Sequence, residues 1–544
     1  MYTYYNMNQL TLDITTSYVP EENSTAHFIN DLVEALKLRE AYLFGRPRSY
    51  NLSVMLKLVL FAYTRETYSS RKIERLAKES LPARWLTQEQ FPSYRTIARF
   101  RISEELQGLI NQGLIELTTF LRKQKLVDDT LFIDGTKILA DANKYSFVWK
   151  KNTLRFEKMN KAQITAILPE LIEAYQLSFI PEGSEMNLEM LEEIITQLEI
   201  RLEDLEKQVT ETEKISPNPA KKKRRKLKSH LRKIKERKQK MVHYETDHLI
   251  FGARNSYSKT DHDATFMRVK EDPMKNGQLK PAYNLQIATS NQFILNYDIF
   301  QNPTDTRTLI PFLNKMKLKE QEPKIIVADA GYGSESNYRY IEDELSQHTA
   351  LIPYGMMRKE QSKKWKSDEQ KVTNWVYNET EDFYTDSKNV RFLFNAYRTR
   401  KDKYGFIREF KEYRAETLDG QLNLIPYALT PKGNPRTINI NSSWEYFKVK
   451  QNEQLSSPEL GKVYAQRKID VEPVFGRMKA YLGFTRFSVR GIEKVKNEIG
   501  LVSLALNMIK LAALGRLNSL KMKNKKGNSI KNHCFNRIPF FCMF

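Results

Sequence analysis

Residues 324–334 read KIIVADAGYGS, and this stretch decides the fold class. Its apolar run is typical of a short buried strand, and Asp329 followed by a Gly-rich turn marks the end of that strand. A second stretch, LFIDG at 131–135, has the same layout, with Asp134 at the strand end and Gly135 in the turn. In α/β proteins the working groups lie beyond the carboxyl ends of strands. Both stretches therefore predict an α/β fold with a site at these two aspartates.

The whole chain is strongly basic. Its 544 residues include 88 Lys and Arg against 66 Asp and Glu, a net charge of +22. Such a charge indicates a polyanionic partner, most often nucleic acid. Both cysteines, Cys534 and Cys542, lie near the end of the sequence, which excludes a cysteine zinc site in the body of the chain. The start lacks the pattern of a signal peptide and no apolar run is long enough for a membrane helix, so we expect a cytoplasmic protein.

Residues 28–125 have the apolar spacing of helices. The predicted helices include 52–66, 69–80 and one that starts at Pro92 and Ser93. We expect Arg95, Arg99 and Arg101 to project from the last of these, an arrangement compatible with helix-turn-helix binding to DNA. An all-helical domain with solvated arginines is the alternative interpretation.

Residues 188–242 predict a helical hairpin. The first arm, 188–214, has heptad spacing and carries nine acids and three bases, whereas the second arm, 221–240, carries thirteen bases and one acid. The sequence SPNP at 216–219 breaks the helix between them. Opposite charges favour pairing of the arms, and the excess of bases could still meet phosphate.

The segments that follow mix strands and helices. AYNLQIATS (282–290) and FILNYDIFQ (293–301) predict a β-hairpin around Asn291, and residues 303–316 predict a helix. Residues 351–450 are polar, aromatic and irregular, with short alternating runs that indicate strands. We interpret this last segment as an insertion between elements of the core.

Three acids stand out by their context: Asp134, Asp329 and Glu472, the last within YAQRKIDVEPVFGRMK (464–479). Carboxylates at the ends of apolar strands are costly to bury unless they are paired or bound to metal. Carboxylate oxygens without nearby His or Cys suit Mg²⁺ or Mn²⁺, and a three-carboxylate cluster in a basic protein fits two-metal phosphoryl transfer. The competing acids, which could instead cap turns, are Asp141, Asp261, Asp263 and Asp305.

Together these motifs resemble those of bacterial insertion-sequence transposases of the DDE class, which have an RNase H-like catalytic core. FIDGTKI resembles the first-Asp motif and VADAGYGSESNY the second, so Asp134 and Asp329 match the first two catalytic acids. Residues 464–491 resemble the Tyr-Arg/Lys-Glu-Lys signature, in which Glu472 matches the third acid. The resemblance covers about residues 40–515, with gaps over the two insertions.

The signature also implies residues that bind DNA phosphate. Tyr464 and Lys479 match its first and last positions. The family has three residues between its Arg and the Glu, whereas Arg467 leaves four before Glu472 and Lys468 leaves three, so either residue could be the basic partner. We add Arg95 and Arg99 to the DNA-binding candidates.

The resemblance implies an RNase H-like mixed sheet flanked by helices, with an N-terminal helical domain, a helical-hairpin insertion and a second, partly β insertion before Glu472. In some relatives an aromatic of the second insertion stacks on a flipped base; Trp375 and Trp365 are candidates, with structural burial as the alternative. The predicted segments are an N-terminal helical DNA-binding domain (1–125), the first part of the core (126–150), a helical coiled-coil hairpin insertion (151–250), the continued core (251–350), the partly β insertion (351–455), the C-terminal helical part of the core (456–515) and a basic, disordered tail (516–544).

The local pattern around Glu472 gives a geometric expectation. Pro473 disfavours a helical residue before it and suits the first turn of a helix, so we predict a helix that starts near Glu472 or is kinked there. Lys479 lies two turns further on and would share a face with Glu472.

The activity implied by the resemblance is that of a DNA transposase. It would bind the terminal inverted repeats of its element as a homodimer, cleave the phosphodiester at each end with Mg²⁺ or Mn²⁺, and join the 3′-hydroxyls to target DNA. The implied partner is double-stranded DNA, with no membrane and no nucleotide cofactor, in the nucleoid of a bacterial cytoplasm. The alternatives are a catalytically silent DNA-binding protein derived from a transposase and a metal-dependent host nuclease with the same core.

Overall fold

The computed structural model describes residues 18–36, 38, 49–177, 187–211, 218–269, 277–316, 323–418, 421 and 423–526. Cys534 and Cys542 lie outside these residues. The chain divides into two compact units. The first unit contains residues up to 138, 284–489 and 493 onward, and the second contains 139–283 and 490–492.

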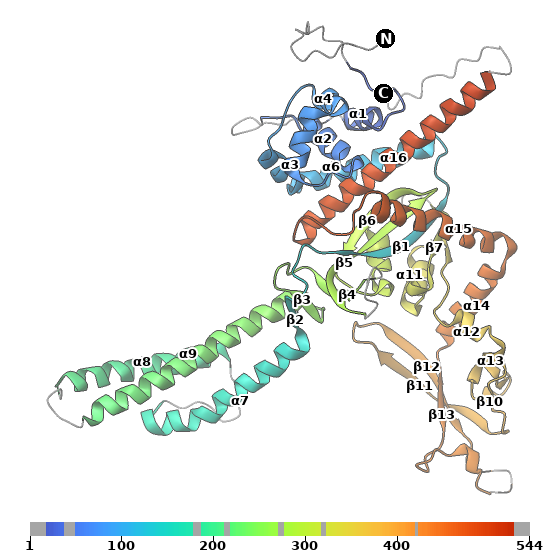
Figure 1. The fold of residues 1–544 in the computed structure, drawn as a ribbon. Coiled ribbons are helices and arrows are strands. Elements are labelled where there is room, and N and C mark those ends of the chain that lie inside the picture. Colours follow the sequence, from blue (N-terminus) through green and yellow to red (C-terminus); the bar gives the residue numbers. More distant parts are fainter. Residues whose placement is uncertain are drawn as a thin grey trace. The chain divides into compact units, whose positions relative to one another are not determined.

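Six helices build the N-terminal part of the first unit (Figure 1). They are α1 (Thr25–Ala35), α2 (Leu52–Thr64), α3 (Ser70–Glu79), α4 (Leu81–Thr87), α5 (Tyr94–Arg101) and α6 (Glu104–Lys123). The Ser93 side chain caps α5 by accepting a hydrogen bond from the backbone N–H of Thr96, so this helix starts where the sequence predicts. The short helix α4 lies between α3 and α5 in the chain, so α5 does not follow α3 through a single turn.

Arg101 does not project from α5 as predicted; it is buried. Its guanidinium donates to Glu498 Oε1 at 2.7 Å, to Tyr63 Oη at 2.8 Å and to Ser488 Oγ at 2.8 Å. Only 8% of the Arg101 side chain and 2% of the Glu498 side chain are exposed. A buried charge needs a partner, and this partner is 397 residues away in the sequence, which local pattern cannot reveal.

A mixed sheet forms the centre of the first unit. Its strands are β1 (Thr130–Leu139), β4 (Thr265–Arg268), β5 (Leu279–Ser290), β6 (Phe293–Phe300), β7 (Ile325–Ala328) and β8 (Thr349–Leu351). The order is β4-β5-β1-β7-β8, and β6 also pairs with β5. β1, β7 and β8 are parallel neighbours, and β5 and β6 form the predicted antiparallel hairpin. Asn291 and Gln292 turn this hairpin with φ values of 49° and 60°, the left-handed conformation that matches strand twist in a two-residue turn. This mixed α/β architecture is consistent with an RNase H-like core.

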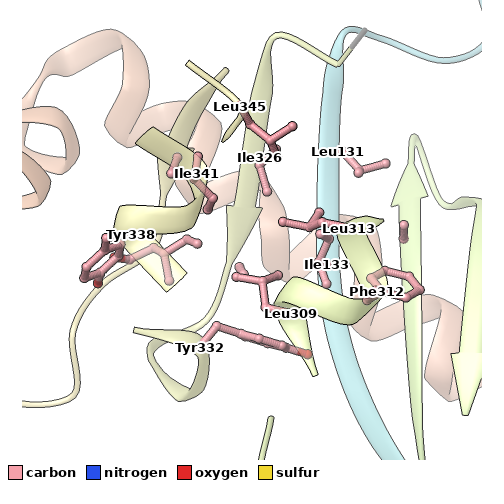
Figure 2. Close-up of a cluster of buried hydrophobic side chains, with 14 of the residues drawn as sticks. Leu131, Ile133, Leu309, Phe312, Leu313, Ile326, Tyr332, Tyr338, Ile341 and Leu345 are labelled. Atoms are coloured by element: carbon pink, nitrogen blue, oxygen red, sulfur yellow. The ribbon is translucent and has the colours of Figure 1, made fainter. Parts of the chain in front are cut away.

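One face of the sheet buries an apolar cluster (Figure 2). Leu131 and Ile133 of β1 and Ile326 of β7 contact side chains of the helices α10 (Leu309–Met316) and α11 (Glu335–Glu344). Phe447 of α14 (Ser442–Ser456) also belongs to the cluster. Because strand side chains alternate between faces, Asp134 points to the opposite face from Ile133.

Helix α15 (Pro458–Gly476) lies on that opposite face. Its Asp470 accepts a hydrogen bond from Thr289 Oγ1 at 2.5 Å and another from the backbone N–H of Gln292 at 3.1 Å. Burial raises the pKa of the Asp470 carboxyl, although these two hydrogen bonds oppose the rise. The turn between β5 and β6 thereby docks the helix onto the sheet.

The prediction that a helix starts near Glu472 is wrong. Helix α15 begins at Pro458, after Ser457, and runs through Pro473. A proline removes the hydrogen bond that the carbonyl four residues earlier would accept, here that of Ile469. Gln292 Nε2 donates to that carbonyl instead, at 2.8 Å, which compensates the loss. A π-helical turn, Arg477–Tyr481, follows α15 directly.

The segment between β8 and α14, which the sequence predicts to be an insertion, contains a five-stranded antiparallel sheet. Its elements are α12 (Met357–Glu360), α13 (Lys363–Lys366), β9 (Val376–Asn378), β10 (Phe383–Thr385), β11 (Arg391–Lys401), β12 (Ile407–Ala415) and β13 (Thr437–Ile440). Phe392 and Tyr413 anchor a small apolar core of its own. The strands fall within the segment that the sequence marks as partly β.

Helix α16 (Ile492–Lys526) is the longest helix of the described residues. Its Ile492–Gly515 part is long and apolar enough to cross a membrane, but 72% of the most apolar window is buried within the protein, as in a core helix. The predicted disordered tail starts at 516, whereas α16 continues to Lys526, because LNSLKMKNKK contains no Gly or Pro. The remainder of that tail lies outside the described residues.

The second unit contains three long helices and short strands. Its elements are β2 (Phe147–Trp149), α7 (Lys150–Tyr175), α8 (Leu188–Glu211), α9 (Pro219–Phe251), β3 (Ser256–Ser258) and β4 (Thr265–Arg268), and β4 pairs with the first residues of β5. Helices α8 and α9 lie side by side and antiparallel (Figure 1). Their ion pairs are Glu192–Lys238 at 2.6 Å, Glu199–Lys235 at 2.5 Å and Glu206–Lys228 at 2.7 Å. Helix α7 also packs against α9, a partner that the sequence pattern did not show.

Candidate active site and nucleic-acid interface

Asp134 and Asp329 lie at equivalent positions of neighbouring strands. In the parallel pair β1 and β7, Ile133 is in register with Ala328, and each aspartate is the next residue. Parallel strands lie about 4.8 Å apart and in-register residues point to the same face. The fold therefore brings together two carboxylates that are far apart in the sequence.

Each of these carboxylates is oriented by the backbone of a nearby glycine. The sequence predicts a strand that ends at Asp134, but this is wrong: β1 continues through Gly135 to Leu139, and only Asp329 directly follows a strand. Gly135 N donates to Asp134 Oδ1 at 2.8 Å, and Gly331 N donates to Asp329 Oδ1 at 2.7 Å. A Cβ at Gly135 would lie 2.3 Å from Gln286 Nε2, and one at Gly331 would lie 2.9 Å from Asp329 Oδ1. A side chain at either position would therefore clash, which explains the glycines of the two motifs.

Tyr332 lies fully buried at the base of this region, as Figure 2 shows beside α10. Its pKa lies well above the ordinary value because of burial and, next, because of the negative charges of Asp305, Asp134 and Asp329. Its hydroxyl donates to Gln286 Oε1. Asp305 also lies near this site, since a Cβ on Gly331 would be 2.9 Å from Asp329 Oδ1 and 3.9 Å from Asp305 Oδ2.

Helix α15 contributes a cation to Asp134. Arg467 Nη1 lies 3.1 Å from Asp134 Oδ2, with both side chains mostly buried. Glu472 is five residues further on, about 140° around the helix from Arg467, and it is exposed. Lys468 is also exposed and lies only about 40° from Glu472. The structure thus separates the two candidate basic partners: Arg467 faces the sheet, and Lys468 shares the outer face with Glu472.

The remaining signature residues flank this helix face. Tyr464 is half-buried on the same side as Lys468, four residues earlier. Lys479 lies in the π-helical turn, and its Nζ donates to the backbone carbonyl of Lys137 on β1 at 3.3 Å. The wider π turn changes the simple helical spacing between Glu472 and Lys479 that the sequence suggested. It also brings Lys479 to the strand that carries Asp134.

The donor set fits a hard divalent cation in part. Asp134 and Asp329 offer carboxylate oxygens, which Mg²⁺ and Mn²⁺ prefer, and the glycines beside them, Gly135 and Gly331, carry no side chain. Glu472 does not join them here: within the described ranges, no three His, Cys, Asp or Glu side chains are arranged to hold a metal ion. The structure therefore assembles two of the three predicted ligands.

The competing acids occupy other places. Asp141 pairs with Arg490 at 2.9 Å, and Asp263 Oδ2 accepts from the backbone N–H of Ile492 at 2.9 Å. Asp261 accepts from Tyr283 Oη at 2.8 Å, and burial raises the pKa of its carboxyl. These three belong to the second unit, whereas Asp305 belongs to the first unit together with Asp134 and Asp329.

The two tryptophan candidates of the β insertion are partly buried. Trp375 packs on Phe392 with ring centroids 4.9 Å apart, and its Nε1 donates to the Glu369 carbonyl at 2.8 Å. Trp365 Nε1 donates to Thr373 Oγ1 at 3.2 Å, and Lys371 Nζ lies 4.8 Å from its ring centroid. Both side chains therefore have structural contacts in this conformation.

The exposed basic residues of α5 form a separate surface. Arg95 and Arg99 are exposed, and the Arg95 guanidinium lies 5.8 Å from the Tyr94 ring centroid. The Arg71 guanidinium of α3 lies 5.1 Å from the same ring. Two arginines from two helices thus surround one tyrosine, a combination of positive charge and an aromatic side chain that suits phosphate and sugar contacts.

Sequence reasoning missed the polar residues that support the site. Asn284 and Gln286 are buried in β5, and both donate to Asp305 Oδ1, at 2.8 and 3.1 Å. The available signal was the presence of two amides within an otherwise apolar strand, since buried polar groups need partners.

A mixed sheet with paired aspartates on adjacent parallel strands, in a strongly basic chain, is typical of enzymes that transfer phosphoryl groups of nucleic acids. Two domain families match the chain: the transposase DDE domain over residues 254–508 and a transposase domain (DUF772) over residues 14–103. Together they cover more than half of the sequence, and the chain belongs to the insertion-sequence transposases of the DDE class. No curated protein and no solved structure matches the chain.

The two matched segments contain most of the candidate residues. Asp329 and Glu472 lie within the DDE domain, and Arg95 and Arg99 lie within the other domain. Asp134 lies outside both, in the segment between them. Transposases of this class act on DNA and generally use divalent metal ions, and they are generally soluble proteins.

Proposed function

We propose that this transposase binds the terminal inverted repeats of its insertion sequence, cleaves the phosphodiester at each end and joins the released 3′-hydroxyls to target DNA. The observation that carries the proposal is the register of β1 and β7, which sets Asp134 beside Asp329. Asp134 lies within β1 and Asp329 directly follows β7, and Arg467 of α15 contacts Asp134 on this face of the sheet.

Asp134, Asp329 and Glu472 are the proposed ligands of Mg²⁺ or Mn²⁺. Bound there, the ions would activate the attacking water or 3′-hydroxyl and stabilise the leaving oxygen. Because Glu472 is exposed in this structure, its carboxylate would have to turn towards Asp134 and Asp329 when DNA is bound. The chain around it supports such a change: Pro473 and the π-helical turn Arg477–Tyr481, which both follow Glu472, interrupt the regular hydrogen-bond ladder of the helix.

The cations of α15 have two proposed roles. Arg467 neutralises Asp134 and holds that carboxylate in place while the site is without DNA. Lys468, Tyr464 and Lys479 would contact phosphates near the cut, since Lys468 lies on the exposed side of the helix with Glu472. Lys468 is therefore the better candidate for the basic position of the signature.

Recognition of the element end is assigned to the N-terminal helices. Arg95 and Arg99 project from α5 into solvent, and phosphate contacts by such residues fix the register of a protein on DNA. We propose that two copies act together on the two ends of the element, in the nucleoid of a bacterial cytoplasm.

The test uses purified protein, Mg²⁺ and a labelled duplex that carries the DNA end flanking the gene. We expect end-specific cleavage followed by joining, and a loss of more than about 100-fold in both steps for Asp329→Asn and Glu472→Gln, a larger loss than outer partners of a metal site typically cause. Glu459→Gln is the matched control, because Glu459 is also an exposed acid of α15.

The outcomes separate the proposal from its alternatives. Binding without cleavage by the wild-type protein would refute it in favour of a silent DNA-binding protein. Cleavage without joining would indicate a nuclease. Equal activity of the Glu472→Gln and Glu459→Gln variants would show that Glu472 is not a metal ligand.

A further inference from the structure

Asp305 is the one competing acid that the fold places beside Asp134 and Asp329. It begins the short 3₁₀ helix η1 (Asp305–Arg307), just before α10. Its Oδ1 accepts hydrogen bonds from Asn284 Nδ2 at 2.8 Å and Gln286 Nε2 at 3.1 Å, both on β5. Lys137 Nζ of β1 lies 3.2 Å from Oδ1 and 3.3 Å from Oδ2. One carboxylate thus joins two strands of the sheet.

The same carboxylate also lies close to both glycines. A Cβ placed on Gly135 would be 2.9 Å from Asp305 Oδ1, and one placed on Gly331 would be 3.9 Å from Asp305 Oδ2. The next residue, Thr306, donates from Oγ1 to the carbonyl of Gly331 at 2.8 Å. Residues 305–306 therefore lie against Gly135, next to Asp134 in β1, and against the turn after Asp329.

The contacts place Asp305 behind the acids and not among them. Gly135 and Lys137 lie on the opposite face of β1 from Asp134, because side chains alternate along a strand. Two amides and an ammonium already donate to Asp305 Oδ1, and the same ammonium lies 3.3 Å from Oδ2. A carboxylate with its lone pairs engaged in this way holds its neighbours in position and is poorly available to a metal ion.

We infer that Asp305 is a positioning residue that sets the separation of Asp134 and Asp329 from the far side of the sheet, and that Lys137 is its counter-charge. Divalent metals tolerate only small errors in the distances between their ligands, so the link between β1, β5 and the β7 turn controls how tightly the metal is bound. The inference rests on the proposed function, because it assumes that Asp134 and Asp329 bind the metal.

The test measures metal affinity directly. Purified full-length protein is titrated with Mn²⁺, and the signal of free Mn²⁺ is followed by electron paramagnetic resonance. Asp305→Ala is expected to weaken Mn²⁺ binding by about 10–100-fold, the usual effect of losing a partner that orients metal ligands. Asp298→Ala is the matched control: Asp298 of β6 also pairs with a lysine, Lys315 at 3.2 Å, and it should bind Mn²⁺ like the wild type.

Lys137→Met gives a second measurement that does not depend on how well Asp305→Ala folds. Removing a cation near a metal site strengthens metal binding by simple electrostatics. The positioning role predicts the opposite, a weakening of at least about 3-fold, since the link to β1 is lost. Thermal unfolding of each variant reports whether the fold is intact.

The results separate this inference from the proposed function. Stronger Mn²⁺ binding by Lys137→Met, or wild-type affinity in a folded Asp305→Ala variant, would overturn the positioning role alone. A wild-type protein that shows no saturable Mn²⁺ binding, or that binds it equally after Asp329→Asn, would refute the proposed metal site and this inference with it.

Discussion

Replacing Arg101 with methionine tests whether one arginine of α5 stabilises the fold while its neighbours bind DNA. The change removes four contacts, to Glu498, Tyr63, Ser488 and, at 3.4 Å, Ser70. Glu498 would remain 2% exposed with only its bonds from Ser488 and Tyr63. Breaking a buried ion pair from one side costs about 3–5 kcal/mol, because the remaining charge stays buried.

The assay is denaturant unfolding followed by tryptophan fluorescence. A loss of about 4 kcal/mol would reduce the ratio of folded to unfolded protein by nearly a factor of 1,000. The double variant Arg101→Met with Glu498→Leu should be less destabilised than Arg101→Met alone, since it leaves no unpaired charge. The control is Arg95→Met, where an exposed side chain should change the free energy of unfolding by less than about 0.5 kcal/mol.

DNA binding should depend on the exposed arginines, Arg95 and Arg99, more than on the buried Arg101. Arg95→Met and Arg99→Met are each expected to reduce the slope of log affinity against log salt by about 0.9, the effect of one lost phosphate contact. Equal destabilisation by the Arg101 and Arg95 variants, or an unchanged salt slope after loss of both exposed arginines, would refute this division of roles.

Three further outcomes follow from other parts of the structure. Gly135→Ala should lower the free energy of unfolding by about 2–4 kcal/mol and abolish cleavage, because the new Cβ would displace Gln286 from its hydrogen bonds. The control is Gly113→Ala in α6, where a Cβ would meet Leu504 at 3.6 Å. In the same denaturation assay this control should be neutral or stabilising by up to about 1 kcal/mol. Burial lowers the pKa of Lys510 from 10.5 to about 8, so between these pH values only the unfolded state holds the proton. The stability of the wild type relative to Lys510→Met should therefore rise from pH 8 to 9.5, by at most about 1.4 kcal/mol per pH unit in thermal unfolding. A stability difference that falls with pH would contradict this prediction. Changing four exposed bases of α9 to glutamine should weaken DNA binding and its salt dependence more than the same change at the three lysines that pair with α8, and equal effects would argue against a DNA-binding role for this helix. The exposed bases are Lys222, Arg225, Lys233 and Lys240, and the paired ones are Lys228, Lys235 and Lys238.

The sequence predicted the elements whose patterns are local. The apolar runs before Asp134 and Asp329 and the hairpin around Asn291 correspond to β1, β7 and the β5–β6 pair, because burial and turn chemistry act over a few residues. That the two aspartates would become neighbours came from family resemblance, since strand order does not follow from periodicity.

The features that could not be predicted depend on distant partners. Pro473 ends a helix by its own chemistry, and only the amide of Gln292 allows the helix to continue. Arg101 and Arg99 are both arginines in the last turn of α5, but only the Arg101 side chain is buried, because it forms an ion pair with the buried Glu498 of α16. Asp305 looks like a turn residue until Asn284 of β5 is placed beside it.

The contact at Gly500 has a consequence for how such enzymes can be divided and recombined. A Cβ there would lie 2.3 Å from Tyr297 Oη of β6 and 2.6 Å from Ile110 Cγ2 of α6, so helix, sheet and N-terminal helices meet without space for a methyl group. Tyr68 adds a hydrogen bond to the carbonyl of Leu482 at 2.7 Å. The N-terminal helices, which include the proposed recognition arginines, therefore pack directly against α16 and the central sheet. A fragment without them would expose the apolar side of α16 to water and aggregate, and a hybrid enzyme with a foreign recognition domain would require a matching α16.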